Sequence, residues 1–477
     1  MSVLRWGAAV LLTPLVLLAC HSTESGEGSA SSSTRRRPNI LLIVADDLGY
    51  ADCGFTGSRD VRTPSLDRLA QAGVRFTDAH VSASVCAPSR AGLLTGRYQQ
   101  EFGFECNLGG KGGLLTGERT LARALGSTGY RTIAIGKWHL GHAPEQHPME
   151  QGFEHFTGLL GGSRSYFPIE DKQPSAGQRI ERDRVPVAES EFEYLTDFLS
   201  DEAIARIGDR EVEEPFFLYL SYTAPHSPNH ARPDLFESYS DAIPDKGRRT
   251  YASMVSAMDE GIGRVVEALD ARGELDDTLI VFLSDNGGAT TNHSDNGPWR
   301  GMKGSKWEGG QRVPFLVHWP AAFDAQVFDG MTSSLDIMPT ALAAAGVEGV
   351  AQDSALDGVD LLPHLRGSTA EPPHERLFWR RSVAAAVRSG DWKLIRVTEL
   401  DGSFAAPVLV NLRTHPDEYV DLAGDQAERV RSMLADLAAW EQTLVEPRWR
   451  EGKRWEANQR AKHRPDARGR EAERRLP

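Results

Sequence analysis

Short runs of apolar and β-branched residues recur along the chain, and each is followed directly by polar residues. The first run covers residues 39–45 and ends in Asp46 and Asp47. Similar runs occupy residues 132–135, 216–220 and 279–283. A continuous apolar run of this length is typical of a strand that is covered on both faces. We therefore predict four buried strands, each of which delivers polar side chains at its carboxyl end.

Segments with helical periodicity lie between these strands, at residues 120–126 and 251–269. Strands that alternate with helices indicate a mainly parallel α/β sheet. In open sheets of this kind, ligands bind outside the carboxyl ends of the strands. The pattern thus predicts that the four polar segments converge on one site.

The pattern changes after about residue 365. Two short strands are predicted within residues 382–397, around a Ser-Gly-Asp turn, and an amphipathic helix within residues 425–444. We assign residues 366–447 to a smaller C-terminal α+β domain. The basic segment 448–477 is interpreted as a solvated tail or a frayed helix. The more specific and less favoured alternative is that it docks a polyanionic substrate.

The composition is that of a soluble globular protein with one large and one smaller domain. The chain has 477 residues, of which 40% are hydrophobic and 25% are charged. The formal net charge is −14. Because nucleic-acid binding depends on Lys and Arg that neutralise phosphates, this charge argues against a nucleic-acid partner. An enzyme for anionic substrates would have to concentrate its positive charges locally.

The beginning of the chain predicts export. An apolar run over residues 8–19 is too short to span a bilayer, so residues 1–20 are predicted to be a signal peptide. Residues 17–20, LLAC, resemble a bacterial lipobox, in which Cys20 would be acylated and would anchor the chain to a membrane. Ordinary cleavage just before this cysteine is the alternative. Residues 21–37 are predicted to be the flexible tether of a periplasmic or outer-membrane, cell-surface lipoprotein.

Export implies an oxidising compartment, in which cysteine pairing becomes informative. If Cys20 is acylated and Cys86 is catalytic, Cys53 and Cys106 remain to form a disulfide. The alternative, that both are buried thiols, fits the sequence equally well. The sequence leaves this choice open.

The most specific segment is residues 86–97, CAPSRAGLLTGR. Pro88 suits the first turn of a helix, so Cys86 is predicted to lie at a helix N-terminus, where the helix dipole would lower the pKa of its thiol. Arg90 follows one turn later. From the residues alone, Cys86 would be a thiolate nucleophile that attacks a tetrahedral oxyanion.

This segment resembles the signature of the type I sulfatases, Cys-x-Pro-Ser-Arg followed by Ala-x-Leu-Leu-Thr-Gly-Arg, and matches it at each defining position. The resemblance covers about residues 38–320. It implies an alkaline-phosphatase-like α/β/α sandwich, whose catalytic domain we assign to residues 38–365. It also implies a sulfuric ester hydrolase of the arylsulfatase type, in which a dedicated maturation enzyme oxidises Cys86 to formylglycine (3-oxoalanine).

The resemblance further implies a metal site. The matching ligand positions are Asp46, Asp47, Cys86, Asp285 and Asn286. Carboxylate and amide oxygens are hard donors that suit Ca²⁺ or Mg²⁺ and not Zn²⁺. We expect Ca²⁺, because it accepts crowded and irregular oxygen coordination, and Mg²⁺ is the alternative. Taken alone, an Asp-Asp pair after a strand could be a helix cap.

Four more residues match active-site positions of the family: Lys137, His139, His226 and Lys303. A sulfate ester is negatively charged, and charge builds on the leaving oxygen during hydrolysis. We therefore expect Lys137, Lys303 and Arg90 to bind the sulfate oxygens.

The resemblance also implies roles in proton transfer. The hydrated aldehyde at Cys86 would attack sulfur with Asp285 as the base, and His226, assisted by Lys303, would protonate the leaving oxygen. The second hydroxyl would then expel sulfate, a step for which His139 is the expected base. A serine at this position would lack the second hydroxyl and would stall as a covalent ester.

The expected substrate is a fragment of a sulfated polysaccharide or an aryl sulfate, and residues 290–299 could line sugar subsites. A phosphonate monoester or phosphodiester hydrolase of the same superfamily is the first alternative. A two-zinc phosphatase is disfavoured, because the additional His and Asp ligands are not found. An inactive carbohydrate-binding lipoprotein on a sulfatase scaffold is the alternative from another class, and the intact catalytic set argues against it.

The C-terminal domain departs from the family pattern Leu-Tyr-Asp-Leu-x-x-Asp-Pro-x-Glu. Residues 409–418, LVNLRTHPDE, keep only its outline. How the small domain docks on the large one is therefore not predicted.

Overall fold

The computed structural model describes residues 37–107, 112–171 and 173–463. The predicted signal peptide, Cys20 and nearly all of the predicted tether lie outside the described residues, so these interpretations stay predictions. The described residues all belong to one compact unit. No helix in the described part of the chain combines the length and the apolar character needed to cross a membrane.

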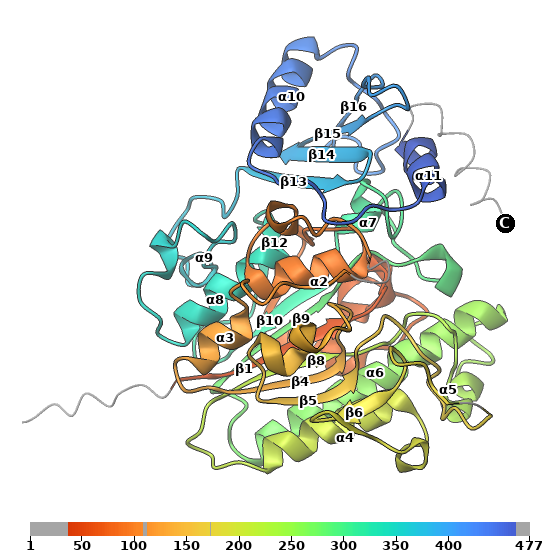
Figure 1. Ribbon diagram of the computed structural model, residues 1–477, viewed down its shortest axis with the longest axis vertical. Helices are drawn as coiled ribbons and strands as arrows, with labels where there is room; N and C mark the ends of the chain where they lie inside the picture. The colour runs from red at the N-terminus through yellow and green to blue at the C-terminus, as the bar shows by residue number, and fades with distance from the viewer. Residues whose placement is uncertain (1–36, 108–111, 172, 464–477) are drawn as a thin grey trace, which may run out of the picture. The chain divides into compact units, whose positions relative to one another are not determined.

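A ten-stranded sheet, in the order β11-β2-β10-β9-β1-β8-β4-β5-β6-β7, runs through the large domain (Figure 1). The four predicted strands are its central neighbours, and they pair in parallel: β9 (Thr278–Ser284), β1 (Asn39–Ala45), β8 (Phe216–Ser221) and β4 (Arg131–Lys137). The outer strands are β11 (Gln326–Phe328), β2 (Val74–Phe76), β10 (Phe315–His318), β5 (His155–Leu159), β6 (Ile180–Arg182) and β7 (Val185–Pro186). β5 extends the parallel run, whereas β10 and β6 pair antiparallel with β9 and β5.

Alternate side chains of the central strands enter two separate cores. On β1, Ile40, Leu42 and Val44 belong to one core, and Leu41 and Ile43 belong to the other. The first core is covered by α2 (Cys86–Thr95), α3 (Leu121–Gly126), α8 (Ile337–Ala344) and α9 (Leu362–Leu365). The second is covered by α1 (Pro64–Ala72), α4 (Leu195–Gly208), α5 (Pro233–Ser238) and α6 (Lys246–Ala271). The predicted α/β/α sandwich is confirmed.

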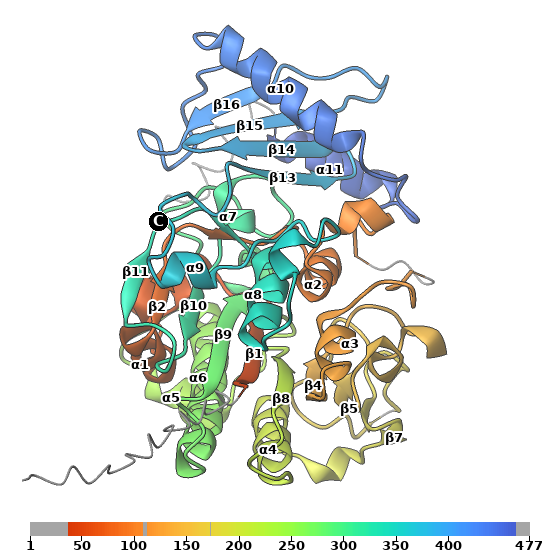
Figure 2. The same cartoon turned by 90° about the vertical axis from the view of Figure 1, so that its left-hand side faces the viewer.

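The C-terminal part builds its own antiparallel sheet (Figure 2). Its strands, in spatial order, are β13 (Arg376–Arg381), β14 (Ala384–Ser389), β15 (Trp392–Val397) and β16 (Val408–Asn411). α10 (Ala427–Glu441) covers one face through Met433, Leu437 and Trp440. The two predicted strands are β14 and β15, and the predicted helix is α10, whereas β13 and β16 were not predicted. A short parallel pair, β3 (Ala79–His80) and β12 (Thr332–Ser333), forms a third sheet.

The basic segment near the C-terminus is not a solvated tail over its described part. Residues Lys453–His463 form α11, whose residues Gln459 and His463 are buried. Nε of Arg460 donates a hydrogen bond to the carbonyl of Thr398 at 2.9 Å, just after β15. The helix is thus part of the packed C-terminal domain.

Two further sequence interpretations bear on the fold. Cys53 and Cys106 are free, buried thiols. The structure therefore agrees with the alternative of two unpaired thiols and not with a disulfide. The domain boundary expected at residue 365 falls at the end of α9 and before β13.

Candidate active site

The predicted site residues converge at the carboxyl ends of four adjacent strands. Asp46 and Asp47 follow β1, Asp285 follows β9, Lys137 ends β4, and His226 lies in the loop after β8. Parallel neighbours end at the same edge of a sheet, so segments far apart in sequence meet there.

Cys86 joins this edge from another direction, because it is the first residue of α2. The residue is buried, and its Sγ lies 3.4 Å from Oδ1 of Asp46 and 3.8 Å from Oδ1 of Asp47. Nζ of Lys303 lies 3.0 Å from the same sulfur. The start of α2 therefore brings residue 86 against the acidic pair.

The expectation of a low pKa for Cys86 is wrong. Burial, and then the carboxylates of Asp285 and Asp46, raise the pKa of the thiol well above its ordinary value. Removal from water thus outweighs the helix dipole. An unmodified Cys86 would be a protonated thiol here, which is a poor nucleophile.

The acidic residues form a compact group that could hold a cation. Potential ligand atoms of Asp46, Asp47, Cys86 and His226 all lie within 4.8 Å of one another. The second predicted pair adjoins this group: the backbone N–H of Asp47 donates to Oδ1 of Asp285 at 3.3 Å, and Nδ2 of Asn286 donates to Oδ1 of Asp47 at 2.8 Å.

The chemistry of these donors fits a hard divalent ion. Three carboxylates and one amide oxygen are the ligand types that Ca²⁺ and Mg²⁺ prefer. Oδ1 of Asn286 is buried and has no hydrogen-bond partner in the described part of the chain. A buried carbonyl oxygen without a partner is costly, and a cation would satisfy it.

Two lysines balance the negative charge of this group. Nζ of Lys137 lies 2.5 Å from Oδ2 of Asp46, and Nζ of Lys303 lies 2.6 Å from Oδ1 of Asp47. Burial alone would raise the pKa of Asp46, but Lys137, His226 and Arg90 hold it well below its usual range. The pKa of Lys303 is raised by Asp47 against the opposing effect of burial. Lys303 is therefore charged.

Arg90 lies beneath the site, without access to solvent. Its Nε and one terminal nitrogen each lie 2.8 Å from Oδ2 of Asp285. The other terminal nitrogen donates to the carbonyl of Lys137 and to the hydroxyls of Tyr219 and Ser221. These contacts orient Asp285, and the terminal nitrogen beside Asp285 has no hydrogen-bond partner of suitable geometry in the described part of the chain. The expectation that Arg90 binds substrate oxygens stays a prediction.

The two histidines differ in their surroundings. Nδ1 of His226 donates to the carbonyl of Ser227 at 2.6 Å, which leaves Nε2 facing Oδ2 of Asp47 at 3.5 Å. His139 adopts a positive φ of 57°, and burial, followed by the charge of Lys137, lowers its pKa well below the usual value. His226 is thus placed to exchange a proton at Nε2, and His139 is a neutral base.

The arrangement agrees with the comparisons to known proteins. A family model described as Sulfatase matches residues 38–347, more than half of the chain. The chain belongs to the sulfatase family. Arylsulfatase A of Homo sapiens is 35% identical over 457 residues, which cover 86% of this chain and 88% of the human protein. N-acetylgalactosamine-6-sulfatase of Homo sapiens is 34% identical over 391 residues, which cover 77% of this chain and 73% of the human protein.

Solved structures give the same result for the fold. This sulfatase aligns with Ps i-CgsB in complex with k-i-k-neocarrahexaose at a TM-score of 0.80 and 36% identity, over 90% of this chain and 98% of the other. The phosphonate monoester hydrolase of Agrobacterium radiobacter shares the fold at a TM-score of 0.61 and 22% identity, over 86% and 96% of the two chains. The sulfatase is a sulfuric ester hydrolase with an alkaline-phosphatase-like fold.

Sequence reasoning missed the individual role of Asn292, which it included only in a stretch of possible sugar contacts. Nδ2 of this buried residue donates to the carbonyl of Asp47 at 3.3 Å and to that of Pro225 at 3.2 Å. It thereby ties the loop of the acidic pair to the loop of His226. Asp47 adopts a left-handed conformation, with φ 64°, which is uncommon for a residue with a side chain and is held by such contacts. No local sequence signal distinguishes Asn292 from a solvated loop residue.

A second buried group has ligand atoms as close together as the first: Asp78, His80 and Glu308. Cations of the protein already pair with its carboxylates, namely Arg312, Arg388 and Lys393. This group is therefore a salt-bridge network that joins the two domains, and we assign it no ion.

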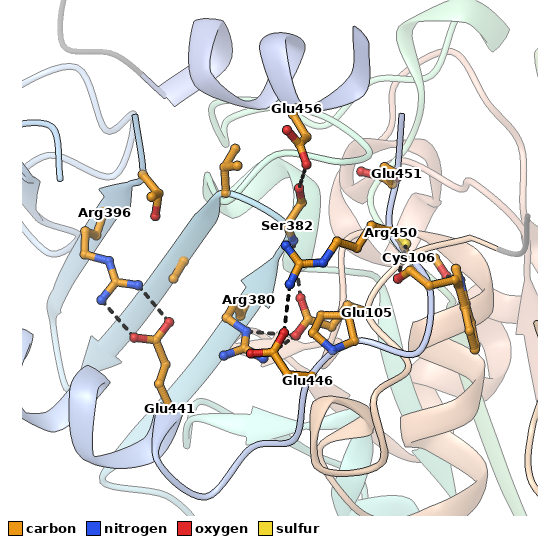
Figure 3. Close-up of a pocket in the computed structure, with 15 residues that line it drawn as sticks. Glu105, Cys106, Arg380, Ser382, Arg396, Glu441, Glu446, Arg450, Glu451 and Glu456 are labelled. Atoms are coloured by element: carbon orange, nitrogen blue, oxygen red, sulfur yellow. Dashed lines mark hydrogen bonds and ion pairs between the residues drawn. The ribbon is translucent and has the colours of Figure 1, made fainter. Parts of the chain in front are cut away.

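A pocket of about 270 Å³ beside β13 to β15 is lined by none of the site residues (Figure 3). Its glutamates are already engaged, in the pairs Glu105–Arg380, Glu441–Arg396, Glu446–Arg450, Glu451–Arg381 and Glu456–Ser382. Since these polar groups bind one another, we assign the pocket no part in the chemistry.

Proposed function

We propose that this sulfatase removes sulfate from sulfated carbohydrates, with formylglycine at position 86 and one divalent cation. The observation that carries the proposal is the close approach of Cys86, Asp46, Asp47 and Lys303 at one end of the sheet. A nucleophile, an acidic ligand set and a cationic side chain within hydrogen-bonding distance of one another suit attack on an anionic ester.

The residue at position 86 needs modification to act. The raised pKa of Cys86 argues against a free thiolate. We propose that a maturation enzyme recognises the Cys-x-Pro-x-Arg core, supplies the oxidant and removes the sulfur to leave the aldehyde. A hydrated aldehyde there supplies two hydroxyl groups, one that accepts the sulfo group and one that releases it again.

The surrounding residues bind the ester and move protons. The ammonium groups of Lys137 and Lys303 offset the charge of the sulfo group as it transfers. Asp285, oriented by Arg90, takes the proton of the attacking hydroxyl.

His226 gives a proton from Nε2 to the leaving oxygen, because its Nδ1 is committed to Ser227. His139, kept neutral by burial, accepts the proton of the remaining hydroxyl when sulfate leaves.

We propose Ca²⁺ as the cation and Asp46, Asp47, Asp285, Asn286 and the modified Cys86 as its ligands. When bound, the cation polarises the oxygen atoms of residue 86 and of the sulfo group. Incubation with a chelator should therefore lower the rate of aryl sulfate hydrolysis by roughly 10²-fold or more. Addition of Ca²⁺ should restore the rate more fully than Mg²⁺, and full activity in a protein shown by elemental analysis to be metal-free would contradict the proposal.

The proposed substrate class rests on a relative that was solved with a bound carbohydrate, Ps i-CgsB with k-i-k-neocarrahexaose. We propose that the substrate is a sulfated galactan or a related sulfated polysaccharide fragment. The test compares kcat/KM on carrageenan-type oligosaccharides, an aryl sulfate and an aryl phosphate. A preference for phosphate or phosphonate esters would favour the alternative of a phosphonate monoester or phosphodiester hydrolase. Binding of the oligosaccharide without sulfate release by matured enzyme would favour the inactive binding protein.

We also propose export and anchoring through acylated Cys20. An apolar run followed by a lipobox-like sequence supports this location. The native protein should fractionate with membranes, and Cys20→Ala should release it. Wild-type protein that stays in the soluble cytoplasmic fraction would overturn the proposal.

A further inference from the structure

Lys303 lies on a loop before α7 (Glu308–Gln311), residues 300–307, which we call the Lys303 loop. Two backbone hydrogen bonds tie the loop around Lys303 to earlier segments of the large domain. The N–H of Lys303 donates to the carbonyl of Gly288 at 3.1 Å, and the N–H of Gly304 donates to the carbonyl of Ser84 at 2.7 Å. Ser84 lies two residues before Cys86, so the loop is tied to the start of α2.

The C-terminal domain holds the other end of the loop. Three consecutive residues, 306–308, each donate a hydrogen bond to an acceptor in the C-terminal domain. The pairs are Lys306 N–H to Nε2 of His463 at 2.7 Å, the Trp307 indole N–H to the Lys462 carbonyl at 3.1 Å, and Glu308 N–H to Oε2 of Glu418 at 2.7 Å. Two of the three acceptors belong to the end of α11.

His463 is suited to act as a permanent acceptor. Its Nδ1 lies 2.7 Å from the carbonyl of Gln459, so Nδ1 carries the proton and Nε2 accepts. The His463 side chain is buried, and the centroid of its ring lies 6.1 Å from that of Trp307. Burial, and then the charge of Lys306, lower the pKa of His463 well below its ordinary value, so it stays neutral.

We propose that α11, through His463, is a positioning element of the active site that holds the Lys303 loop against Asp47 and Cys86. The loop contains two glycines, Gly301 and Gly304, at positive φ values of 88° and 82°. Glycine restricts the backbone less than any other residue, so contacts outside the loop help to decide where it lies. A displacement of about 1 Å in a reacting group can lower the rate by roughly 10²-fold. This inference rests on the proposed role of Lys303.

The test uses full-length, matured enzyme with an aryl sulfate as the probe. His463→Leu fills similar space without an acceptor, so kcat should fall about tenfold. Metal content should be unchanged. His463→Gln, whose amide oxygen can accept, should recover most of the loss. Asn458→Ala, at an exposed position of the same helix, is the matched control and should retain wild-type kcat.

Coupling to Lys303 separates positioning from a general loss of stability. In a Lys303→Ala background, His463→Leu should cause little further loss, because the side chain that it positions is absent. An undiminished tenfold loss in that background would overturn the role of α11 but leave the proposed function intact. Wild-type kcat in His463→Leu would also overturn it. Full activity of Lys303→Ala alone would contradict both proposals.

Discussion

Replacement of Cys86 by serine is expected to abolish turnover. Oxidation to the aldehyde starts from the thiol, so a serine at this position would keep its single hydroxyl. One hydroxyl can accept the sulfo group but cannot release it, because the second hydroxyl of the hydrated aldehyde is missing. We expect kcat for an aryl sulfate to fall by on the order of 10⁴–10⁶-fold.

Mass spectrometry of the inactive variant provides a second readout. After incubation with substrate, the peptide that contains residue 86 should carry one sulfo group. Cys106→Ser replaces a buried thiol outside the site and serves as the matched control, with activity close to that of the wild type. A Cys86→Ser variant that turns over at an appreciable rate would contradict the mechanism.

Asp285→Asn should impair both stability and activity. The substitution removes the negative charge that pairs with Arg90 at 2.8 Å, in a place where neither side chain reaches solvent. A buried charge left without its partner costs about 3–5 kcal/mol, which urea denaturation of the folded protein would measure. Loss of the proposed base should lower kcat by roughly 10²–10⁴-fold.

The control for this prediction is Asp270→Asn, an exposed carboxylate near the end of α6. It should change neither the urea midpoint nor kcat measurably. An Asp285→Asn variant with wild-type stability would show that Arg90 is not held by this carboxylate. Wild-type kcat would remove Asp285 from the proton transfer.

The central strands could be predicted because their signal is local. Each of β1, β4, β8 and β9 is buried on both faces, so its sequence is a continuous apolar run. In the C-terminal sheet, the strands that were missed are those at its two edges. In β13, the buried apolar residues Leu377 and Trp379 alternate with residues that are exposed or partly exposed. β16 has only four residues. Neither gives a run long enough to identify from sequence.

The convergence of the candidate site residues at one edge of the sheet could also be predicted, but their energetics could not. Polar residues directly after buried strands reveal where side chains meet, and the motif around Cys86 identifies their chemistry. The pKa of Cys86 depends on how completely the folded chain excludes water, and the orientation of Arg90 depends on partners from distant segments of the chain. The position of Cys86 at a helix N-terminus predicted a lowered thiol pKa, whereas burial raises it.

The composition of α11 does not indicate that this helix packs against the rest of the protein. Many Lys and Arg residues favour a solvated helix, and only Gln459 and His463 are buried. Both are polar, and the partner of His463 is the backbone of Lys306, more than a hundred residues earlier. A contact of this kind follows from tertiary structure and not from local pattern.

A crystal structure of the matured, active enzyme grown with Ca²⁺ is the most direct test of the central claim. We expect one ion with oxygen ligands at about 2.3–2.6 Å from Asp46, Asp47, Asp285 and Asn286, beside an oxidised side chain at position 86. An unmodified thiol at position 86 in protein that turns over, or an ion bound away from these residues, would contradict the account.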